Sequence, residues 1–138
     1  MNISDKKFLV LYCYYEVKNF QKNQTNLSFF IRHAMNIHKW KPLNIEYLFI
    51  INGYKCEVLI PKLFNVNILK EENCSDFEGW NNGINYIKAK FSLTEINEKY
   101  DYIFFINASA YGPFIDPNNK CHWLEPYYNK IEKEKSII

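Results

Sequence analysis

The 138-residue sequence predicts one α/β domain built on a mostly parallel sheet. Three runs, residues 8–15, 46–52 and 101–107, are almost continuously apolar, as is typical of strands that are covered on both faces. Segments with helical spacing of apolar residues lie between the strands, and this alternation indicates right-handed crossovers between parallel strands. Hydrophobic residues make up 48% of the chain, which is enough to build a core.

The first half of the chain predicts two strands and one helix. Residues 8–15 form the first strand, and residues 23–39 form a helix with a mostly helical apolar pattern. That pattern consists of Leu27, Phe30, Ile31, Ala34, Met35 and Ile37. The second strand covers residues 46–52 and is closed by Gly53, and residues 57–60 suggest a short extended piece.

The second half repeats this alternation. Residues 65–70 predict a third strand, residues 76–91 a helix, and residues 101–107 a fourth strand. The apolar stripe of the helix is Phe77, Trp80, Ile84, Ile87 and Phe91. After a Gly/Pro loop, residues 123–131 predict a last helix with Pro126 near its first turn. The expected fold is a mostly parallel, Rossmann-like sheet flanked by helices.

Composition argues against several classes of protein. The net charge is +2 and no basic stripe stands out, so we expect no nucleic-acid partner. No apolar run is long enough for a transmembrane segment, and no secretory signal is present, so we expect a cytoplasmic protein or one on a cytoplasmic membrane face. The four cysteines are widely spaced, which favours reduced thiols. The common phosphate-binding and dinucleotide-binding glycine motifs are absent.

Two segments place polar residues where predicted strands end. They are residues 70–80, KEENCSDFEGW, and residues 102–114, YIFFINASAYGPF. The carboxyl ends of parallel strands form the ligand-binding edge of open α/β sheets, so the two segments predict a nucleotide-type pocket.

Asp76 is the main candidate in the first segment. Where a loop enters a helix, an Asp most often caps the helix, and we favour this role over that of a ligand group that accepts hydrogen bonds from a ribose or a base. The two roles are compatible. Trp80 fits core packing on the sheet, while Glu71 and Glu72 are either surface charges or part of the pocket rim.

Asn107, Ser109 and Gly112 form the polar patch of the second segment. Asn107 ends a strand that is too apolar to be exposed, so its amide must find partners. The turn at Gly112 offers backbone amides that can cradle phosphate oxygens. An ordinary transition from strand to loop explains the same pattern about equally well.

The other candidates carry weaker signals. Cys121 and His122 are adjacent but lack spaced partners, so we predict no metal site there. His33 and His38 lie on the first predicted helix and fit surface or packing roles. Asp116 is, with Glu125, one of two acids soon after the turn.

Both segments resemble motifs of glycosyltransferase-like proteins with a GT-A-type nucleotide-sugar fold, related to rhamnan-synthesis and polysaccharide-synthesis proteins. In that group a stretch close to Arg-Glu-Asn-x-Gly/Cys-x-Asp-Phe-Gly-Ala-Trp follows the third strand, and residues 70–80 are similar to it. A later stretch near Phe-Leu-Asn-Ser-Ser-x-Arg-Gly-Pro-Phe is similar to residues 105–114. Weaker likeness at residues 14–16, 29–30 and 51–53 extends the resemblance over nearly the whole chain.

The resemblance implies the nucleotide-binding half of a GT-A fold. It implies a pocket for a nucleoside diphosphate sugar, transfer of the sugar to a glycan or other hydroxyl acceptor, and a role in polysaccharide biosynthesis. Asp76 best matches a nucleoside-contacting acid. Asn107 and Ser109 fall where many GT-A enzymes carry an Asp-x-Asp metal motif.

Three positions depart from the family pattern. Glu72 replaces an Asn, Glu78 replaces a Gly and Tyr111 replaces an Arg, which removes a cation that would offset diphosphate charge. The Asn-Ala-Ser sequence at residues 107–109 lacks the charged oxygen ligands that Mg²⁺ or Mn²⁺ prefers. A metal-independent site and a divalent cation held by Asp116 both stay open.

Length bears on catalysis, because the resemblance covers only the donor-binding half. The second half of such enzymes supplies the acceptor site and the catalytic base, so we expect this chain to be truncated on its C-terminal side. Asp116 is the nearest candidate for a base. The alternatives are a non-catalytic nucleotide-sugar-binding remnant, a module completed by a partner chain or a second copy, and an unrelated flavodoxin-like nucleotide or signalling module.

Overall fold

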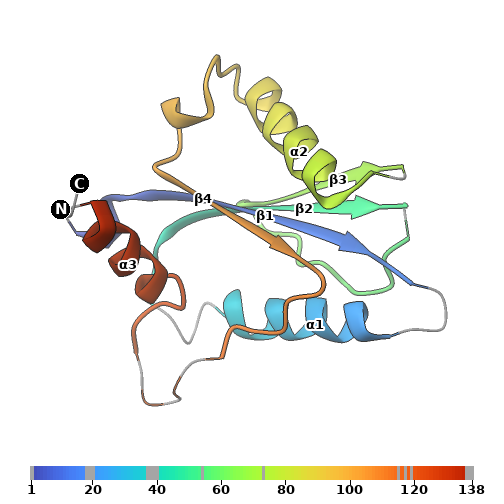
Figure 1. Ribbon diagram of the computed structural model, residues 1–138, viewed down its shortest axis with the longest axis horizontal. Helices are drawn as coiled ribbons and strands as arrows, with labels where there is room; N and C mark the ends of the chain where they lie inside the picture. Colours follow the sequence, from blue (N-terminus) through green and yellow to red (C-terminus); the bar gives the residue numbers. More distant parts are fainter. Residues whose placement is uncertain are drawn as a thin grey trace.

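The computed structural model contains a four-stranded, all-parallel sheet, which confirms the predicted α/β class (Figure 1). It describes residues 2–17, 21–36, 41–53, 55–72, 74–114, 116, 118 and 120–135. The strands are β1 (Lys7–Tyr15), β2 (Asn44–Asn52), β3 (Val66–Glu71) and β4 (Tyr102–Asn107). Their order is β3-β2-β1-β4, so the first strand of the chain is central and β4 forms one edge.

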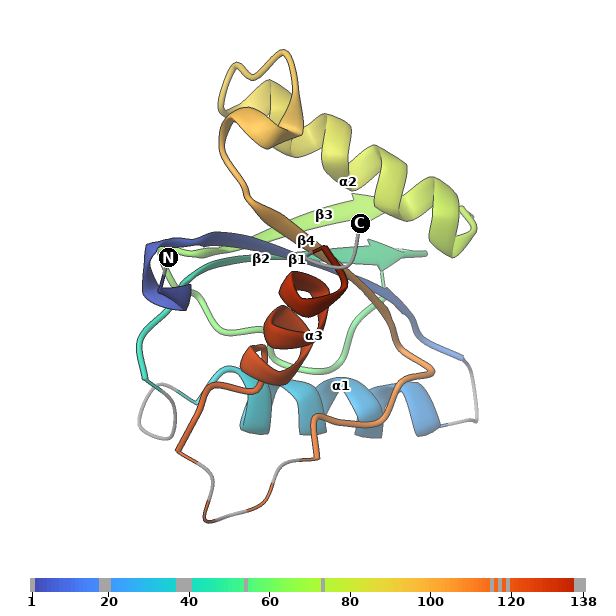
Figure 2. The same ribbon diagram turned by 60° about the vertical axis from the view of Figure 1, so that its left-hand side comes forward.

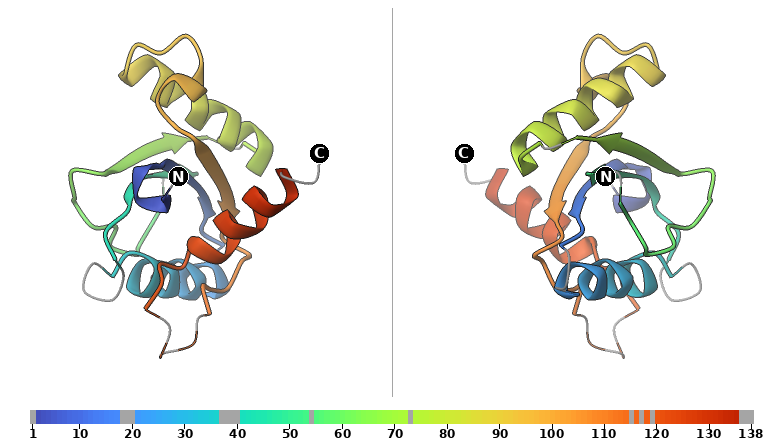
Figure 3. Two further views of the ribbon diagram at one scale, coloured as in Figure 1. Left: turned by 90° about the vertical axis from the view of Figure 1, so that its left-hand side faces the viewer. Right: turned by 90° about the vertical axis from the view of Figure 1, so that its right-hand side faces the viewer.

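Helices cover both faces of the sheet, as a Rossmann-like arrangement requires. They are α1 (Lys22–Ala34), α2 (Asp76–Lys90) and α3 (Glu125–Lys135). The sheet lies between α2 on one face and α1 with α3 on the other (Figures 1 and 3). Along β1 the alternating side chains divide between two cores. Phe8, Val10, Tyr12 and Tyr14 belong to the core on the α1 and α3 side, and Leu9, Leu11 and Cys13 belong to the core beneath α2.

Two glycines let α2 lie close to the sheet. A Cβ atom on Gly79 would lie 2.9 Å from Cys13 Sγ, and one on Gly83 would lie 2.8 Å from Ile50 Cδ1. Phe77 precedes Gly79 by two residues, or about 200° of helical rotation, and therefore faces away from the sheet. It is 80% exposed, although the sequence pattern placed it in the apolar stripe.

An aromatic layer joins α1 and α3 to the other face. The ring of Phe30 on α1 lies 4.9 Å from that of Tyr12, and Tyr128 on α3 contacts Phe8 and Tyr102 edge-on. Figure 2 shows α3 on the same side of the sheet as α1. Aromatic pairs of this kind add about 0.5–1.5 kcal/mol each beyond the area that they bury.

The last helix begins at Glu125, two residues later than predicted, and extends to Lys135. Trp123 and Leu124 are buried but precede the helix, because the chain turns at His122. The Nδ1 atom of His122 accepts a hydrogen bond from the Leu124 amide at 3.2 Å. Burial lowers the pKa of His122 to about 4, so the ring is neutral near pH 7.

The predicted extended piece at residues 57–60 is not a strand. A buried carboxylate holds this segment instead: Glu16, just after β1, accepts hydrogen bonds from the Glu57 amide at 2.9 Å and from the Tyr14 hydroxyl at 3.0 Å. Its other oxygen lies 3.7 Å from Lys55 Nζ. Burial alone would raise the pKa of Glu16, but these hydrogen bonds and the lysine charge hold it below the ordinary value.

Most element boundaries lie within two residues of the predicted ones, and the ends of α1 and α3 differ by five and four residues. The first helix spans Lys22–Ala34 rather than 23–39, and Ile37, His38 and Lys39 lie outside the described residues. At the start of β4, the Lys7 amide donates to Asp101 Oδ2 and the Asp101 amide donates to the Lys7 carbonyl, both at 2.8 Å. This pair fixes where β4 joins β1.

Candidate functional site

The carboxyl ends of all four strands lie at one side of the sheet (Figure 1). β2 and β3 lie on one side of β1 in the sheet, and β4 lies on the other side. The connections therefore diverge on either side of β1, and such a switch point is where open α/β sheets bind ligands.

The two predicted segments meet at this end. Asn107, the last residue of β4, donates from its Nδ2 atom to Oδ2 of Asp76 at 3.0 Å. The Oδ1 atom of Asn107 accepts from the amide of Ser109 at 3.2 Å and from its hydroxyl at 2.6 Å. Asp76, Asn107 and Ser109 thus form one hydrogen-bonded chain. This chain lies at the surface, because β4 is a half-exposed edge strand and not the covered strand that its apolar sequence predicted.

Asp76 is not the cap of α2. Ser75 takes that position: its Oγ accepts from the Glu78 amide at 3.2 Å, and its hydroxyl lies 3.3 Å from Glu78 Oε1. The favoured capping role for Asp76 is therefore wrong. Because Ser75 already satisfies the helix end, the Asp76 carboxylate is available to Asn107 and to a ligand.

Asn52 holds the loop that carries Asp76, and the sequence analysis gave it no role. This last residue of β2 accepts from the Cys74 amide at 3.1 Å through Oδ1 and donates through Nδ2 to the Cys74 carbonyl. Like Asn107, it is an amide at the carboxyl end of an apolar parallel strand, and this shared position is the signal that could have identified it. Cys13 also contacts the loop, with its Sγ 3.6 Å from the Asp76 carbonyl oxygen.

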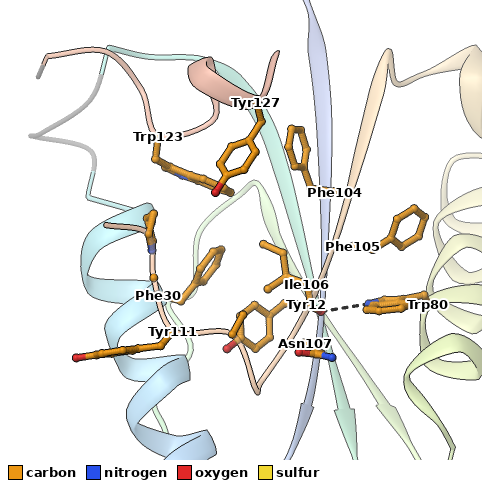
Figure 4. Close-up of a pocket in the computed structure, with 13 residues that line it drawn as sticks. Tyr12, Phe30, Trp80, Phe104, Phe105, Ile106, Asn107, Tyr111, Trp123 and Tyr127 are labelled. Atoms are coloured by element: carbon orange, nitrogen blue, oxygen red, sulfur yellow. Dashed lines mark hydrogen bonds between the residues drawn. The ribbon is translucent and has the colours of Figure 1, made fainter. Parts of the chain in front are cut away.

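A groove of about 380 Å³ opens beside β4 and includes Asn107 in its wall (Figure 4). Trp80 and Phe105 lie on the α2 side of the strand, whereas Phe104, Trp123 and Tyr127 lie on the other side. Its full lining is Tyr12, Phe30, Trp80, Phe104, Phe105, Ile106, Asn107, Ala110, Tyr111, Gly112, Pro113, Trp123 and Tyr127. The groove is thus mostly aromatic and continuous with the polar chain at Asn107.

Two polar groups in the groove wall differ in whether they have a hydrogen-bond partner. The Trp80 indole, expected to pack in the core, is half-buried and donates from Nε1 to the Ile106 carbonyl at 3.2 Å. The Tyr12 hydroxyl is buried and has no hydrogen-bond partner among the described residues. Burial raises the pKa of Tyr12, so the hydroxyl stays protonated and can donate.

Charge is distributed unevenly around the site. None of the residues that line the groove carries a charged side chain. At its Asn107 end, by contrast, the first turn of α2 carries Asp76 and Glu78. Such a rim suits hydrogen-bond donors, such as sugar hydroxyls or a base amine, better than it suits phosphate oxygens.

The remaining candidates fall into two groups. Gly112 lines the groove, whereas Asp116, Cys121 and His122 do not. Asp116 is exposed, accepts from the Asn118 amide at 2.9 Å and does not line the groove. Cys121 is exposed while its neighbour His122 is buried, and a hydrogen bond with Glu125, aided by that carboxylate's charge, raises the pKa of the Cys121 thiol.

Three further features bear on function. Across the described parts of the chain, no three His, Cys, Asp or Glu side chains are grouped so that they could hold a metal ion. No described helix has the length and apolar character needed to cross a membrane. All four cysteines, each within the described ranges, are free thiols.

Comparisons of the chain with protein-family models, with curated proteins and with solved structures found no match.

Proposed function

We propose that this chain is a glycosyltransferase-like protein that binds a nucleoside diphosphate sugar at the Asp76–Asn107 pair and the adjoining groove. The observation that carries the proposal is the 3.0 Å hydrogen bond between Asp76 and Asn107, because it joins the two segments that resemble the family. In this assignment Asp76 accepts hydrogen bonds from the nucleoside. Asn107, Ser109 and the turn at Gly112 face the sugar or the phosphates.

The groove supports a ligand with flat or ring-shaped parts. Aromatic side chains stack on bases and offer apolar faces to sugar rings, and neither interaction needs a charged partner. The buried hydroxyl of Tyr12 supports a polar occupant, because an unpaired buried hydroxyl costs about 1–3 kcal/mol. A ligand acceptor that reaches Tyr12 would remove this cost.

The diphosphate is the least supported part of the ligand. No lysine or arginine lines the groove. The N-terminal end of α2 is already capped by Ser75, and its first turn carries the acids Asp76 and Glu78. Backbone amides after β4 are the remaining donors for phosphate oxygens. We therefore expect the nucleoside and the sugar to contribute more to affinity than the phosphates.

A second candidate is a module that binds the nucleotide sugar without transferring it. It is favoured by the composition of the groove, whose lining residues include no carboxylate, histidine or lysine. Transfer needs a base for the acceptor hydroxyl and stabilisation of the departing diphosphate. Asp116 was the best available base in the sequence, but its side chain lies outside this lining.

Isothermal titration calorimetry with a panel of nucleoside diphosphate sugars tests binding. Asp76→Asn should weaken the best ligand about tenfold or more, because a hydrogen bond to a charged group contributes about 1.5–3 kcal/mol. Glu72→Gln is the matched control, since it removes an equal charge from an exposed position in the same segment. No binding by any member of the panel, or equal losses in both variants, would refute the proposed site and favour the unrelated signalling module.

Tyr12→Phe gives a second, independent test. Removal of an unpaired buried hydroxyl should leave the free energy of unfolding unchanged or raise it, whereas ligand affinity should fall. Opposite signs in urea denaturation and calorimetry would separate ligand contact from a structural role. Equal affinity in the variant and the parent would show that the hydroxyl does not reach the ligand.

Release of nucleoside diphosphate separates the enzyme from the binding module. The assay uses the best donor, with and without Mg²⁺ or Mn²⁺ and with a set of glycan acceptors. Turnover that Asp116→Asn abolishes would assign the base to Asp116. Tight binding without turnover under every condition would support the non-catalytic module.

A further inference from the structure

A second groove, of about 830 Å³, runs along α1, and its lining has one residue, Tyr111, in common with the groove beside β4. Its volume is within the range of about 300–1,000 Å³ that is usual for small-molecule sites. Most of the lining comes from α1, where positions three or four residues apart share one face of the helix. The lining of this α1 groove is Gln21, Gln24, Thr25, Ser28, Phe29, Ile31, Arg32, Glu57, Val58, Leu59 and Tyr111.

The two segments that complete the α1 groove are held by buried side chains. The carboxylate of Glu16, whose side chain is 2% exposed, accepts from the Glu57 amide at 2.9 Å. Asn26 is buried on α1 and donates from Nδ2 to the Ala108 carbonyl at 2.7 Å, just before the loop that carries Tyr111. Because both segments are anchored before a ligand arrives, binding does not have to order them, and this favours affinity.

The helix side of the groove presents a row of amides and hydroxyls. At helical spacing this row consists of Gln21, Gln24, Thr25 and Ser28. Each of these side chains can both donate and accept a hydrogen bond, and sugar hydroxyls have the same dual character. From Gln21 to Arg32 the helix rises about 16 Å, which is longer than a single sugar ring and suits an oligosaccharide.

Tyr111 supplies a fixed aromatic face to the α1 groove. Its side chain is 53% exposed, and its ring lies 4.6 Å from that of Phe29 and 4.9 Å from that of Phe114. Figure 4 shows Tyr111 against α1. An aromatic ring held in this way offers an apolar face to a sugar at little cost in side-chain entropy.

Arg32 gives the groove an uncompensated positive charge. It is the one arginine of the sequence, it is exposed, and it makes no ion pair within the described ranges. The acid of the lining, Glu57, lies 3.5 Å from Lys55 Nζ, so its charge is already offset. A guanidinium binds a carboxylate through two parallel hydrogen bonds, whereas a nucleic acid would require several cations.

A peptide fits the α1 groove less well than a sugar chain does. Peptides bind by adding a strand to a sheet edge, by placing a helix in an apolar groove, or as proline-rich segments in an aromatic-lined groove. The α1 groove is lined by a helix and by segments outside the strands, and six of its eleven lining residues are polar or charged. These features favour a ligand that is rich in hydroxyls.

We propose that the α1 groove binds an oligosaccharide that contains uronic-acid residues. One carboxylate pairs with Arg32, a sugar ring lies against Tyr111, and hydroxyls bond to the row between Gln21 and Ser28. This inference does not rest on the proposed nucleotide-sugar function. If both hold, the shared residue Tyr111 places the oligosaccharide beside the donor, where a glycan acceptor has to lie.

Calorimetry with matched tetrasaccharides tests the charge. The probes are tetrasaccharides of galacturonic, glucuronic and mannuronic acid, each paired with the same tetrasaccharide after reduction of its carboxyl groups to alcohols. At least one acidic probe should bind about fivefold more tightly than its reduced form, the size expected of an ion pair at an exposed arginine. Arg32→Gln should remove this preference. Lys22→Gln removes an equal charge from an exposed position of α1 outside the groove lining, and should keep it.

Amide chemical shifts locate the ligand without a variant. The acidic tetrasaccharide should shift the resonances of residues 21–32 and 57–59 and leave those of α2 unchanged. Asp76→Asn should leave oligosaccharide binding intact, so failure of the nucleotide-sugar site is distinguishable from failure of this one.

Four results would overturn the proposal. They are no binding of any acidic probe at millimolar concentration, equal affinity for the acidic and reduced forms, equal losses in Arg32→Gln and Lys22→Gln, and shifts confined to other parts of the chain. A proline-rich peptide that shifts residues 21–32 when no tetrasaccharide does would also overturn it and assign the groove to a protein partner.

Discussion

Replacing Gly79 with alanine would place a methyl group 2.9 Å from Cys13 Sγ, closer than the two atoms can approach. The sulfur cannot easily yield, because Cys13 is buried in β1 and its thiol also contacts the Asp76 carbonyl. The Cys74 sulfur lies 3.8 Å from the same point and closes the space on another side. Relief therefore requires the first turn of α2 to move away from the sheet.

Two opposing effects set the size of the change. Overpacking of a buried site costs about 1–3 kcal/mol. Alanine recovers at most about 1 kcal/mol through its higher helix propensity. After this offset we expect Gly79→Ala to lower the free energy of unfolding by up to about 2 kcal/mol, which corresponds to a decrease of up to roughly 1 M in the urea midpoint.

Urea denaturation followed by circular dichroism measures this change. Asn81→Ala, at an exposed position of the same helix, is the control and should stabilise by about 0.5 kcal/mol through propensity alone. Adding Cys13→Ala to Gly79→Ala should recover part of the loss, with a coupling energy of about 1 kcal/mol in a double-mutant cycle. Additive effects in the cycle, or a Gly79→Ala variant that is more stable than the parent, would refute the close approach of α2 to β1.

Three further outcomes follow from the buried polar groups. The folded chain binds a proton at His122 less tightly than the unfolded chain, so stability should fall by up to about 3 kcal/mol between pH 6.5 and pH 4. Urea denaturation at several pH values should show a shallower slope for His122→Asn; an unchanged slope would contradict the assignment. Glu16→Gln should cost about 1.5–3 kcal/mol near pH 7, because charge-assisted hydrogen bonds are lost. The pKa of Glu16 is lower in the folded chain than in the unfolded chain. The stability difference between the parent and Glu16→Gln should therefore be full above about pH 4.3 and shrink as the pH falls below it. A difference that stays constant with pH would show that the carboxylate charge is not involved. Burial, with the charge of Asp76 and the neighbouring Cys74, raises the pKa of Cys13 to about 12. A thiol reagent at pH 8 should therefore label exposed Cys121 first and Cys13 only on unfolding. Early labelling that persists in Cys121→Ser would contradict this order.

The two central strands could be predicted because apolar content alone identifies them, and the parallel direction follows from the helices that lie between the strands. β1 and β2 are buried on both faces, and a continuous apolar run is the pattern that such burial requires. The starts of helices were harder to predict. Ser75 and Asp76 are both good capping residues, and only the backbone path shows which of them precedes the first helical turn.

The site was predicted in part for a similar reason. Strand ends supplied Asp76 and Asn107, because parallel strands bring their carboxyl ends together. The aromatic groove was not predicted, since Trp80, Phe105 and Tyr127 are far apart in the sequence and each resembles an ordinary core residue. The role of Glu16 was also missed, because a buried carboxylate is recognised by its partners and these come from a separate segment.

The position of β1 in the middle of the sheet affects the order in which the protein folds. β1 can pair with β2 early, but its other edge is covered by β4, whose clamp joins Lys7 to Asp101 across 94 residues. Contacts so distant in sequence form late, and they slow folding. We expect an intermediate that contains β1, β2 and β3, with one flank of the central strand open until β4 arrives. In a chain still under synthesis, this flank is the surface that a chaperone would need to shield.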